Sequence, residues 1–455
     1  TFWAEIRPIP LSENEVRSIH VSDSIAGVLK IKKETGDTLA KPVSNSRKFL
    51  SALRVIGYGH TWADTSGTRF YFGGLMKIRN FGFNTVDGFT YGINFSLYKK
   101  FEKGSLDISP ELRYAFSRNT LMWRINMQYT IPSADPTRLY VRAGMMSRDI
   151  SNAGGISPVL NMFTSLLMRN NYLKLYDNRF VTTGIGRELV NGLRAELSAG
   201  YEDRRILDNN TDFAFIGRTK RQYTGNTPVN PYLVNPYFAY YQLEDQTHVE
   251  FTARLIYIPR QKFMIQKGTK IPQGSDYPTF SLQWKHGMNR LSGSDGGYTH
   301  FDKIRFEASQ RKSIGAFSSL RWNFRTGYVF NKENLSFIDF NHFNSQPLTL
   351  LFNDYDDAFM LPRFYSLSTP EYYTEFHCKF TTPYLLVKLL PVLSNTLMRE
   401  NLSASWLWSR YNTAYTEIGY SISEVFLLGE AGVYAGFDNF NFSSAGFRLI
   451  LKIGN

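Results

Sequence analysis

Apolar and polar side chains alternate residue by residue in many separate stretches of this 455-residue chain. In the stretch FTYGINFSL, which begins at Phe89, aromatic and aliphatic residues alternate with Thr, Gly, Asn and Ser. Successive side chains of a β-strand point to opposite faces, so the pattern predicts a strand with one apolar and one polar face. The pattern recurs at residues 106–116, 121–131, 193–199, 249–257, 280–285, 304–308, 320–328, 372–380, 401–408, 414–422, 426–436 and 444–453.

The number and length of these stretches favour a barrel over a sandwich. We estimate about 14–18 strands of roughly ten residues, the length that crosses a bilayer at a tilt. A soluble β-sandwich also alternates, with its polar face in water. Aromatic residues near strand ends and charges of both signs on the polar faces are typical of a barrel with aromatic girdles and an aqueous lumen. We therefore predict an all-β fold, a transmembrane antiparallel β-barrel of about 16 strands.

Composition excludes several other classes of protein. Aromatic residues make up 16% of the chain, yet its mean hydropathy is -0.29, and no stretch approaches the roughly 18 apolar residues of a transmembrane helix. The formal net charge is +13, but the basic residues are dispersed and no nucleic-acid-binding motif accompanies them, so we expect no nucleic-acid partner. The single cysteine, Cys378, rules out an intrachain disulfide and a multi-cysteine metal site.

The N-terminal part of the chain differs from the rest. Residues 1–46 lack sustained alternation, and Ser12 followed by Glu15 fits a capping box for a short helix. We expect residues 1–46 to be a periplasmic lead-in that continues from a longer polypeptide. Residues 47–455 are then expected to form the barrel.

Three connections stand out within the predicted barrel. Residues 158–171 carry apolar side chains at helical spacing, which predicts a short helix in the lumen or at the rim. Residues 205–245 are rich in Asn, Pro and Tyr and are expected to form a long loop. Residues 381–393 contain two prolines and are too short to cross a membrane, so an amphipathic interfacial turn is expected there.

Several local stretches resemble a family of uncharacterised outer-membrane β-barrels from Gram-negative bacteria. These stretches are FWAEIRPIPLSENE from Phe2, FNTVDGF from Phe83, NYLKLYDNRF from Asn171, GNTPVNPY from Gly225, YSLSTPEYYTEFH from Tyr365 and TPYLLVKLLP from Thr382. The resemblance implies a barrel in the outer membrane, in contact with its lipid, preceded by a periplasmic carboxypeptidase-regulatory-like domain of immunoglobulin-like fold. It also implies a distant similarity to the BamA and TamA type of assembly barrel, and other envelope proteins or lipoproteins as partners.

The sequence carries no common catalytic fingerprint. A Gly-rich phosphate loop, HExxH and GxSxG are all missing, and none of the seven histidines forms a close pair in sequence. His286, at the end of a strand, and His377, near Glu375, have the chemistry of general bases, but a ring of ordinary polar residues explains them equally well. We therefore predict no catalytic residue, no cofactor and no metal ion.

One acidic cluster could supply oxygen ligands to a divalent cation. It comprises Asp354, Asp356 and Asp357 in the stretch FNDYDDAF. The spacing departs from the calcium-loop pattern, so we favour a solvated loop.

Charged residues on the polar faces are predicted to line the lumen, because an Arg or Lys that faces lipid at the bilayer midplane costs about 2–4 kcal/mol. The basic members are Arg113, Arg124, Arg194, Arg254, Lys285, Arg305, Arg321, Arg325, Arg448 and Lys452. The acidic members are Glu111, Glu196, Glu250 and Glu307, together with Asp107. These residues either form ion pairs across the wall or with a plug, or make a pore selective for anions. Sequence leaves both interpretations open.

The resemblance favours a non-enzymatic envelope component that acts in a complex for the assembly or export of surface proteins. The alternative is a diffusion channel or gated transporter with a charged lumen. In the closing strand, the residues expected to face lipid are Phe447, Leu449, Leu451 and Ile453. Those expected to face the lumen are Arg448, Ile450 and Lys452. That strand is expected to pair with the first one.

Overall fold

The computed structural model describes most of the chain from residue 45 onward. The described residues are 45–133, 135–151, 153–216, 221–234, 243–266, 269–291, 298–332, 335–352, 355–386, 396–410, 414–425 and 429–451. Two compact units divide the chain, Thr1–Tyr58 and Gly59–Asn455, whereas the sequence placed this boundary at residue 46. The helix expected near Ser12 and most of the turn expected at 381–393 lie outside the described residues.

Helices are few and strands are many. The helical elements are α3 (Asn45–Tyr58), which belongs to the first unit, and η1 (Ile78–Asn80), α4 (Pro158–Met168), α5 (Pro231–Val234) and η3 (Phe337–Asp339) of the second. The strands are β1 (His60–Ala63), β2 (Thr68–Phe72), β3 (Phe81–Asn84), β4 (Gly88–Phe101), β5 (Gly104–Ala115), β6 (Thr120–Ile131), β7 (Thr137–Asp149), β8 (Leu175–Val190), β9 (Leu193–Ile206), β10 (Gln246–Tyr257), β11 (Lys262–Gln266), β12 (Thr269–Gly274), β13 (Thr279–Leu291), β14 (Tyr298–Ile314), β15 (Ser318–Phe330), β16 (Leu350–Phe352), β17 (Tyr373–Thr382), β18 (Arg399–Ser409), β19 (Tyr415–Val425), β20 (Gly429–Asp438) and β21 (Asn441–Leu451).

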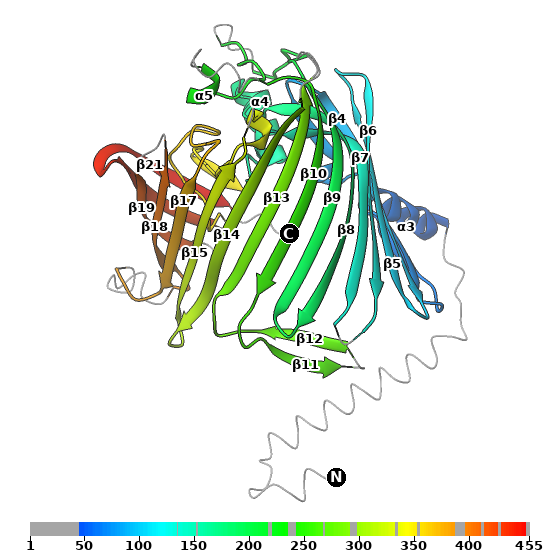
Figure 1. Ribbon diagram of the computed structural model, residues 1–455. Helices are drawn as coiled ribbons and strands as arrows, with labels where there is room; N and C mark the ends of the chain where they lie inside the picture. Colours follow the sequence, from blue (N-terminus) through cyan, green and yellow to red (C-terminus); the bar gives the residue numbers. More distant parts are fainter. Residues whose placement is uncertain are drawn as a thin grey trace, which may run out of the picture. The chain divides into compact units, whose positions relative to one another are not determined.

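The second unit is a large antiparallel β-barrel (Figure 1). Its long strands pair in chain order from β4 through β10, then β13, β14, β15 and β17 through β21. β2 and β3 pair with different parts of β4, Phe70 opposite Leu97 and Phe83 opposite Phe89, and so act as one interrupted strand. The sheet has 19 strands in the described residues. Leaving out β1 and β16, and counting β2 and β3 as one strand, gives 16 strands. This number agrees with the prediction of about 16.

The outer face of the barrel is apolar. Val181 of β8 is 52% exposed, Tyr328 of β15 is 55% exposed, and Val433 of β20 is 56% exposed. A soluble protein rarely exposes a contiguous apolar surface of this extent, whereas a transmembrane barrel presents such a band to lipid. No helix within the described residues is long and apolar enough to span a membrane.

The closing strand shows the predicted alternation most directly. Phe447, Leu449 and Leu451 are 45%, 40% and 40% exposed, while Arg448 and Ile450 are 6% and 2% exposed. The first three therefore lie on the outer face and the last two on the inner face. Lys452, expected on the inner face, and Ile453, expected on the outer face, lie outside the described residues.

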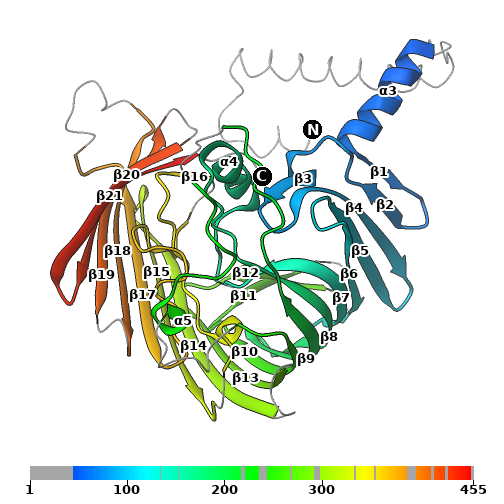
Figure 2. The same ribbon diagram turned by 90° about the horizontal axis from the view of Figure 1, so that it is seen from above.

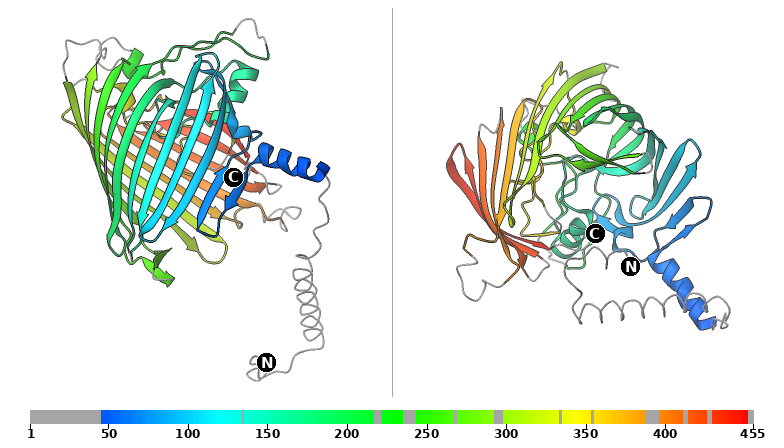
Figure 3. Two further views of the ribbon diagram at one scale, coloured as in Figure 1. Left: turned by 90° about the vertical axis from the view of Figure 1, so that its right-hand side faces the viewer. Right: turned by 90° about the horizontal axis from the view of Figure 1, so that it is seen from below.

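Connections differ between the two ends of the barrel (Figure 3). One end carries short turns, such as Asn191–Gly192 between β8 and β9, where Gly192 has a φ of 82° suited to a tight hairpin. The same end also carries the connection 258–278, which contains β11 and β12. The other end carries the longest connections, 150–174, 207–245 and 331–372. Outer-membrane barrels place short turns on the periplasmic side and longer loops outside. This rule assigns the end with the long connections to the exterior.

The connection between β15 and β17 folds back into the barrel. We call its described residues, 335–352 and 355–372, the internal segment. Leu335, Phe337 and Ile338 pack in a buried cluster with strand residues Phe301 and Val329. A second cluster joins Phe343, Phe359 and Leu367 of this segment to Tyr373, Leu407 and Tyr415 of the wall. The internal segment therefore packs inside the barrel and fills part of the lumen.

The helix predicted at 158–171 is confirmed as α4. Pro158 occupies its first turn, where a missing N–H costs nothing, and Arg169 ends it with a φ of 53°. α4 contacts β3, and its Leu160 belongs to a buried cluster with Leu351 of β16 and Ile450 of β21.

β21 does not meet the first strand in the way we expected. Its last residues pair in parallel with β16 of the internal segment, Leu350 opposite Leu449 and Leu351 opposite Ile450. In the described residues, the partners of β21 are β20 and β16. We call the boundary between β21 and the first strands, β1 to β3, the seam. Seen from above, α4 and β16 lie in the seam (Figure 2).

Candidate functional site

A buried ion pair fixes the internal segment to the barrel wall. Arg204 Nη1 of β9 lies 2.9 Å from Asp339 Oδ1 of η3. Asn289 Nδ2 of β13 donates to Asp339 Oδ2 over 3.1 Å, and Lys303 Nζ of β14 donates to the Asp339 carbonyl oxygen. Arg204 Nε also lies 2.6 Å from Glu202 Oε2. Three strands thus hold a single carboxylate-bearing residue of the internal segment.

The acidic cluster of the internal segment forms a second set of contacts with the wall. Asp356 pairs with Arg321 and lies 3.4 Å from Lys379 Nζ, while Asp357 Oδ2 lies 3.2 Å from Arg325 Nη2. The expectation of a solvated loop is therefore wrong for these two aspartates, because the wall supplies their counter-charges. Asp354 lies outside the described residues.

A third set of contacts uses backbone groups. The two carboxylate oxygens of Glu417 accept hydrogen bonds from the N–H groups of Met360 and Leu361, at 2.7 and 3.0 Å. Arg448 Nε donates to the carbonyl oxygens of Met360, at 2.8 Å, and Gln346, at 3.3 Å. β19 and β21 therefore bind the main chain of the internal segment from the side of the seam.

The stretches that carried the family resemblance converge at the exterior end. Asn226 Oδ1 accepts from the Leu175 N–H at 2.9 Å, and its Nδ2 donates to the carbonyl oxygens of Leu175 and Leu207, both at 2.6 Å. Asn230 Nδ2 donates to the carbonyl oxygen of Tyr365 at 2.7 Å. These contacts join GNTPVNPY to NYLKLYDNRF and to YSLSTPEYYTEFH.

Lys174 and Tyr365 extend the same set of contacts. The Tyr365 hydroxyl donates to Asp149 Oδ1 at 2.7 Å and accepts from the Lys174 N–H at 3.1 Å. Lys174 Nζ donates to Thr224 Oγ1 at 3.0 Å and to the Gly225 carbonyl oxygen at 2.6 Å. Lys174 lies in the connection that follows α4, and burial lowers its pKa to about 8.

FNTVDGF anchors the first hairpin to the same interior. Asp87 Oδ1 accepts from Ser147 Oγ at 2.8 Å and lies 3.1 Å from Arg118 Nε. Asn171, three residues after α4, donates from Nδ2 to Thr85 Oγ1 at 2.8 Å. Thus β3 and β4 are tied to the interior next to the seam.

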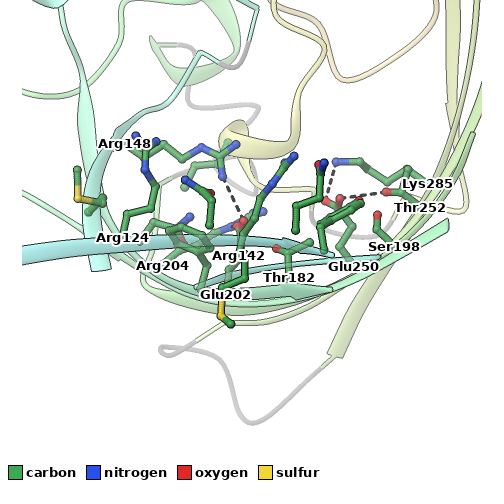
Figure 4. Close-up of a pocket in the computed structure, with 18 of the residues that line it drawn as sticks. Arg124, Arg142, Arg148, Thr182, Ser198, Glu202, Arg204, Glu250, Thr252 and Lys285 are labelled. Carbon is green, nitrogen blue, oxygen red and sulfur yellow. Dashed lines mark hydrogen bonds and ion pairs between the residues drawn. The ribbon is translucent and has the colours of Figure 1, made fainter. Parts of the chain in front are cut away.

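A polar cavity of about 980 Å³ lies beneath η3 (Figure 4). Ile338, Asp339 and Phe340 line it, and its other lining residues come from β4 to β10, β13 and β14. Arg148 Nη1 lies 3.2 Å from Glu202 Oε1 across it.

Most of the residues predicted to line the lumen form short polar contacts with one another. The pairs are Arg113 with Glu111 at 3.5 Å, Arg124 with Glu111 at 2.5 Å, Arg194 with Glu196 at 3.1 Å, Lys285 with Glu250 at 2.6 Å and Arg325 with Glu307 at 3.4 Å. Arg254 donates to Ser281 Oγ at 2.9 Å and Arg305 to Gln283 Oε1 at 3.1 Å.

The cavity is lined by four of the predicted residues, Arg124, Glu250, Lys285 and Asp107. Arg321, Arg325 and Arg448 instead contact the internal segment.

Sequence reasoning missed four basic residues of the cavity, Arg142, Arg148, Arg204 and Lys303. Arg204 continues the alternation of Arg194 and Glu196 along β9, and Lys303 precedes Arg305 by two residues, so a longer reading of the same period would have found both. Asp339 had no such signal.

The histidine that we considered as a base lies in a serine–histidine–glutamate chain. His377 Nε2 is 2.7 Å from Glu375 Oε1, and its Nδ1 is 2.8 Å from Ser405 Oγ. All three residues are buried, and the cavity that borders Ser405 measures only about 20 Å³. No substrate fits there, because one water already needs about that much space. These three hydrogen-bonded side chains join β17 to β18. The ring of Phe359, in the internal segment, packs against the histidine ring.

The other candidate, His286, lies 3.0 Å from Asp302 Oδ1 on the neighbouring strand. Across the described parts of the chain, no group of three or more His, Cys, Asp and Glu residues is placed to hold a metal ion.

Residues 53–422 match the family described as "Family of unknown function (DUF5686) C-terminal domain". The chain belongs to this family. No curated protein matches the chain. The family is uncharacterised, as is the family that the sequence resembles. The structure of this chain has an apolar outer face, and its internal segment lies in the lumen. The protein is an integral outer-membrane β-barrel in contact with membrane lipid.

The chain path is similar, at low sequence identity, to those of several solved structures. BamA from Haemophilus ducreyi lacking POTRA domains 1-3 has a TM-score of 0.41 and 10% identity, over 89% of this chain and 78% of that one. A bacterial polysaccharide outer membrane secretin has a TM-score of 0.32 and 8% identity, over 81% and 92%. The outer membrane protein opdK from Pseudomonas aeruginosa has a TM-score of 0.28 and 9% identity, over 84% and 95%.

Proposed function

We propose that this barrel is a non-enzymatic component of the envelope that assembles or exports other surface proteins, and that its seam is the working surface. The observation that carries the proposal is the pairing of β21, whose edge takes the three-residue parallel strand β16. Its partners are then other envelope proteins or lipoproteins, together with a periplasmic domain that precedes the chain.

Backbone chemistry explains why such an edge suits this role. An unpaired N–H or C=O in lipid costs several kcal/mol, so a strand edge at a seam must be covered. Here the cover is a short segment of the same chain, held by Arg448, Glu417 and packing against α4. A β-strand of a client protein makes the same main-chain hydrogen bonds by strand addition. Exchange of β16 for a client strand would couple the seam to assembly.

A gated transporter is the second candidate. The cavity beneath η3 and its surplus of basic residues favour it, whereas a steady diffusion pore is disfavoured by the ion-paired internal segment that occupies the lumen. Single-channel recording of the purified chain in planar bilayers separates the candidates. Large, steady openings would contradict the assembly role.

A reversible lock on the seam tests the proposed function. In a Cys378→Ser background, Leu351→Cys and Ile450→Cys face each other in the pairing of β16 with β21. Oxidation of this pair should lower the amount of other folded barrel and surface proteins in the outer membrane, and reduction should restore it.

A matched pair controls for the disulfide itself. Ala435→Cys and Ala445→Cys face each other between β20 and β21, which are already joined in the wall. Oxidation of this pair should leave the other envelope proteins unchanged. Heat-modifiable migration on gels verifies that all variants fold. Normal levels of client proteins with the β16–β21 lock closed would refute the role of the seam.

A further inference from the structure

The cavity beneath η3 extends to the periplasmic end of the barrel. Ile338 and Asp339 line it on the side of the internal segment. Its other lining includes Ser105, next to the first residue of β5, and Thr130, next to the last residue of β6. Both residues lie by short turns, at the end assigned to the periplasm. A solute from that side therefore enters the cavity before it meets the internal segment.

The lining of this cavity has a surplus of positive charge. Its basic residues are Arg124, Arg142, Arg148, Arg204, Lys285 and Lys303, and its acidic residues are Asp107, Glu202, Glu250 and Asp339. Glu202 and Asp339 are both engaged by Arg204. Arg142 lies over the ring of Tyr140, 4.8 Å from its centroid, and no acidic side chain in the described part of the chain pairs with it. One guanidinium at the cavity therefore lacks a counter-anion.

Two buried polar groups at the same cavity also lack partners in the described residues. Asn178 is 0% exposed, and neither its Nδ2 nor its Oδ1 has a hydrogen-bond partner. The hydroxyl of Tyr176, a residue 1% exposed, is likewise unpartnered. Both residues border the cavity. Buried donors and acceptors of this kind are usually satisfied by a ligand or by ordered water.

The remaining lining indicates the chemistry of a ligand. Hydroxyl and amide side chains predominate, and the aromatic rings of Tyr98, Tyr140, Phe180 and Phe340 stand among them. In the described residues the aliphatic side chains of the lining are Met127, Met146 and Ile338. Peptides need apolar subsites for their side chains, whereas saccharides need dispersed donors, acceptors and flat aromatic faces.

We propose that this cavity binds a soluble anionic saccharide from the periplasm, with Arg142 and Arg148 on its carboxylate or phosphate groups and Asn178 on its hydroxyls. The planar guanidinium suits both anions, because it donates two parallel hydrogen bonds. The ligand lies next to Asp339, so its binding reports on the anchor of the internal segment. The inference does not depend on the assembly role.

Calorimetry on the purified full chain in detergent tests this site. Trigalacturonate is the probe, and maltotriose is the neutral saccharide of equal length. Trigalacturonate should bind with a dissociation constant below about 1 mM, and maltotriose at least about tenfold more weakly. Arg142→Gln should weaken trigalacturonate binding by about tenfold. Arg254→Gln, at a luminal arginine outside the cavity lining, should leave it unchanged.

Three results would overturn the proposal. Trigalacturonate binding weaker than about 1 mM would remove the site. Equal binding by Arg142→Gln and the unsubstituted chain would move the ligand elsewhere, and tighter binding of tetraglutamate than of trigalacturonate would assign the cavity to acidic peptides. Heat-modifiable migration establishes that each variant is folded, so a loss of binding is attributable to the side chain.

Discussion

Arg204 of β9 and Asp339 of η3 form a buried ion pair with 2.9 Å between Nη1 and Oδ1, across 135 positions of sequence. Both residues are buried, at 4% and 7% exposure. Removing one partner of a buried pair costs about 3–5 kcal/mol, because the other charge is left without compensation. The pair therefore holds the internal segment in one position in the lumen.

Asp339→Asn is expected to loosen the internal segment. Asn keeps an acceptor oxygen but removes the charge, and the loss of a charged hydrogen bond costs about 1.5–3 kcal/mol. In planar bilayers the variant should show more frequent openings, and trypsin should cleave faster at Arg363 of the internal segment. Asp276→Asn is the control, because its pair with Lys262 is exposed and worth little. Openings and cleavage equal to those of the unsubstituted chain would contradict a locking role for Asp339.

Asn226→Ala is expected to destabilise the exterior end of the barrel. The substitution leaves three backbone groups of Leu175 and Leu207 without their partner, at about 1–3 kcal/mol for each buried group. Urea unfolding in detergent micelles measures the loss. Asn441→Ala, at an exposed residue with a single 3.4 Å bond, should change the unfolding midpoint little. Similar unfolding midpoints for both variants would show that the hydrogen bonds of Asn226 do not stabilise the barrel.

Val433→Arg is expected to impair insertion into lipid. Val433 is 56% exposed at the middle of β20, so the substitution places a charge on the outer face near the midplane, at about 2–4 kcal/mol. Phe116→Arg adds the same charge just beyond the end of β5, where the cost falls to about 0–1 kcal/mol. Folding yield into vesicles should fall for the first variant only. An equal yield for both would mean that Val433 does not face lipid.

Acidification is expected to weaken the internal segment through His342. Burial lowers the pKa of His342 from 6.5 to about 3, so the imidazole stays neutral in the packed segment and gains a proton near pH 6.5 when the segment opens. The opened state therefore binds more protons below pH 6.5, and the free energy of opening falls as the pH falls. Between pH 7.5 and pH 5 the loss is about 2 kcal/mol.

His342→Gln should remove this part of the pH dependence. Hydrogen exchange of the internal segment, corrected for the intrinsic effect of pH, compares the variant with the unsubstituted chain. The two proteins should differ in how much opening increases on acidification. The same increase in both would place the pH dependence on other groups.

The direction of each side chain on the wall was predictable from sequence. Period-2 alternation placed Phe447 and Leu449 outside and Arg448 inside, because a strand has no other way to orient successive residues. It missed Arg204, where our reading of the period stopped early, and it missed Arg142 and Arg148 because we did not predict the strand that carries them, β7. The ion pairs of the acidic cluster were not predictable, because nothing in the local sequence marks Asp356 and Asp357 as partners of distant wall residues.

The sequence by itself determined that this protein is a membrane β-barrel of about 16 strands, because each strand carries its two faces in its own pattern. The tertiary structure decided what fills that barrel. Asp339, Asp356 and Met360 lie in a segment without periodicity, and their roles follow from wall residues that folding brings beside them. The pairing of β16 with β21 was decided in the same way, since strand partners depend on which edge remains free after the wall has formed.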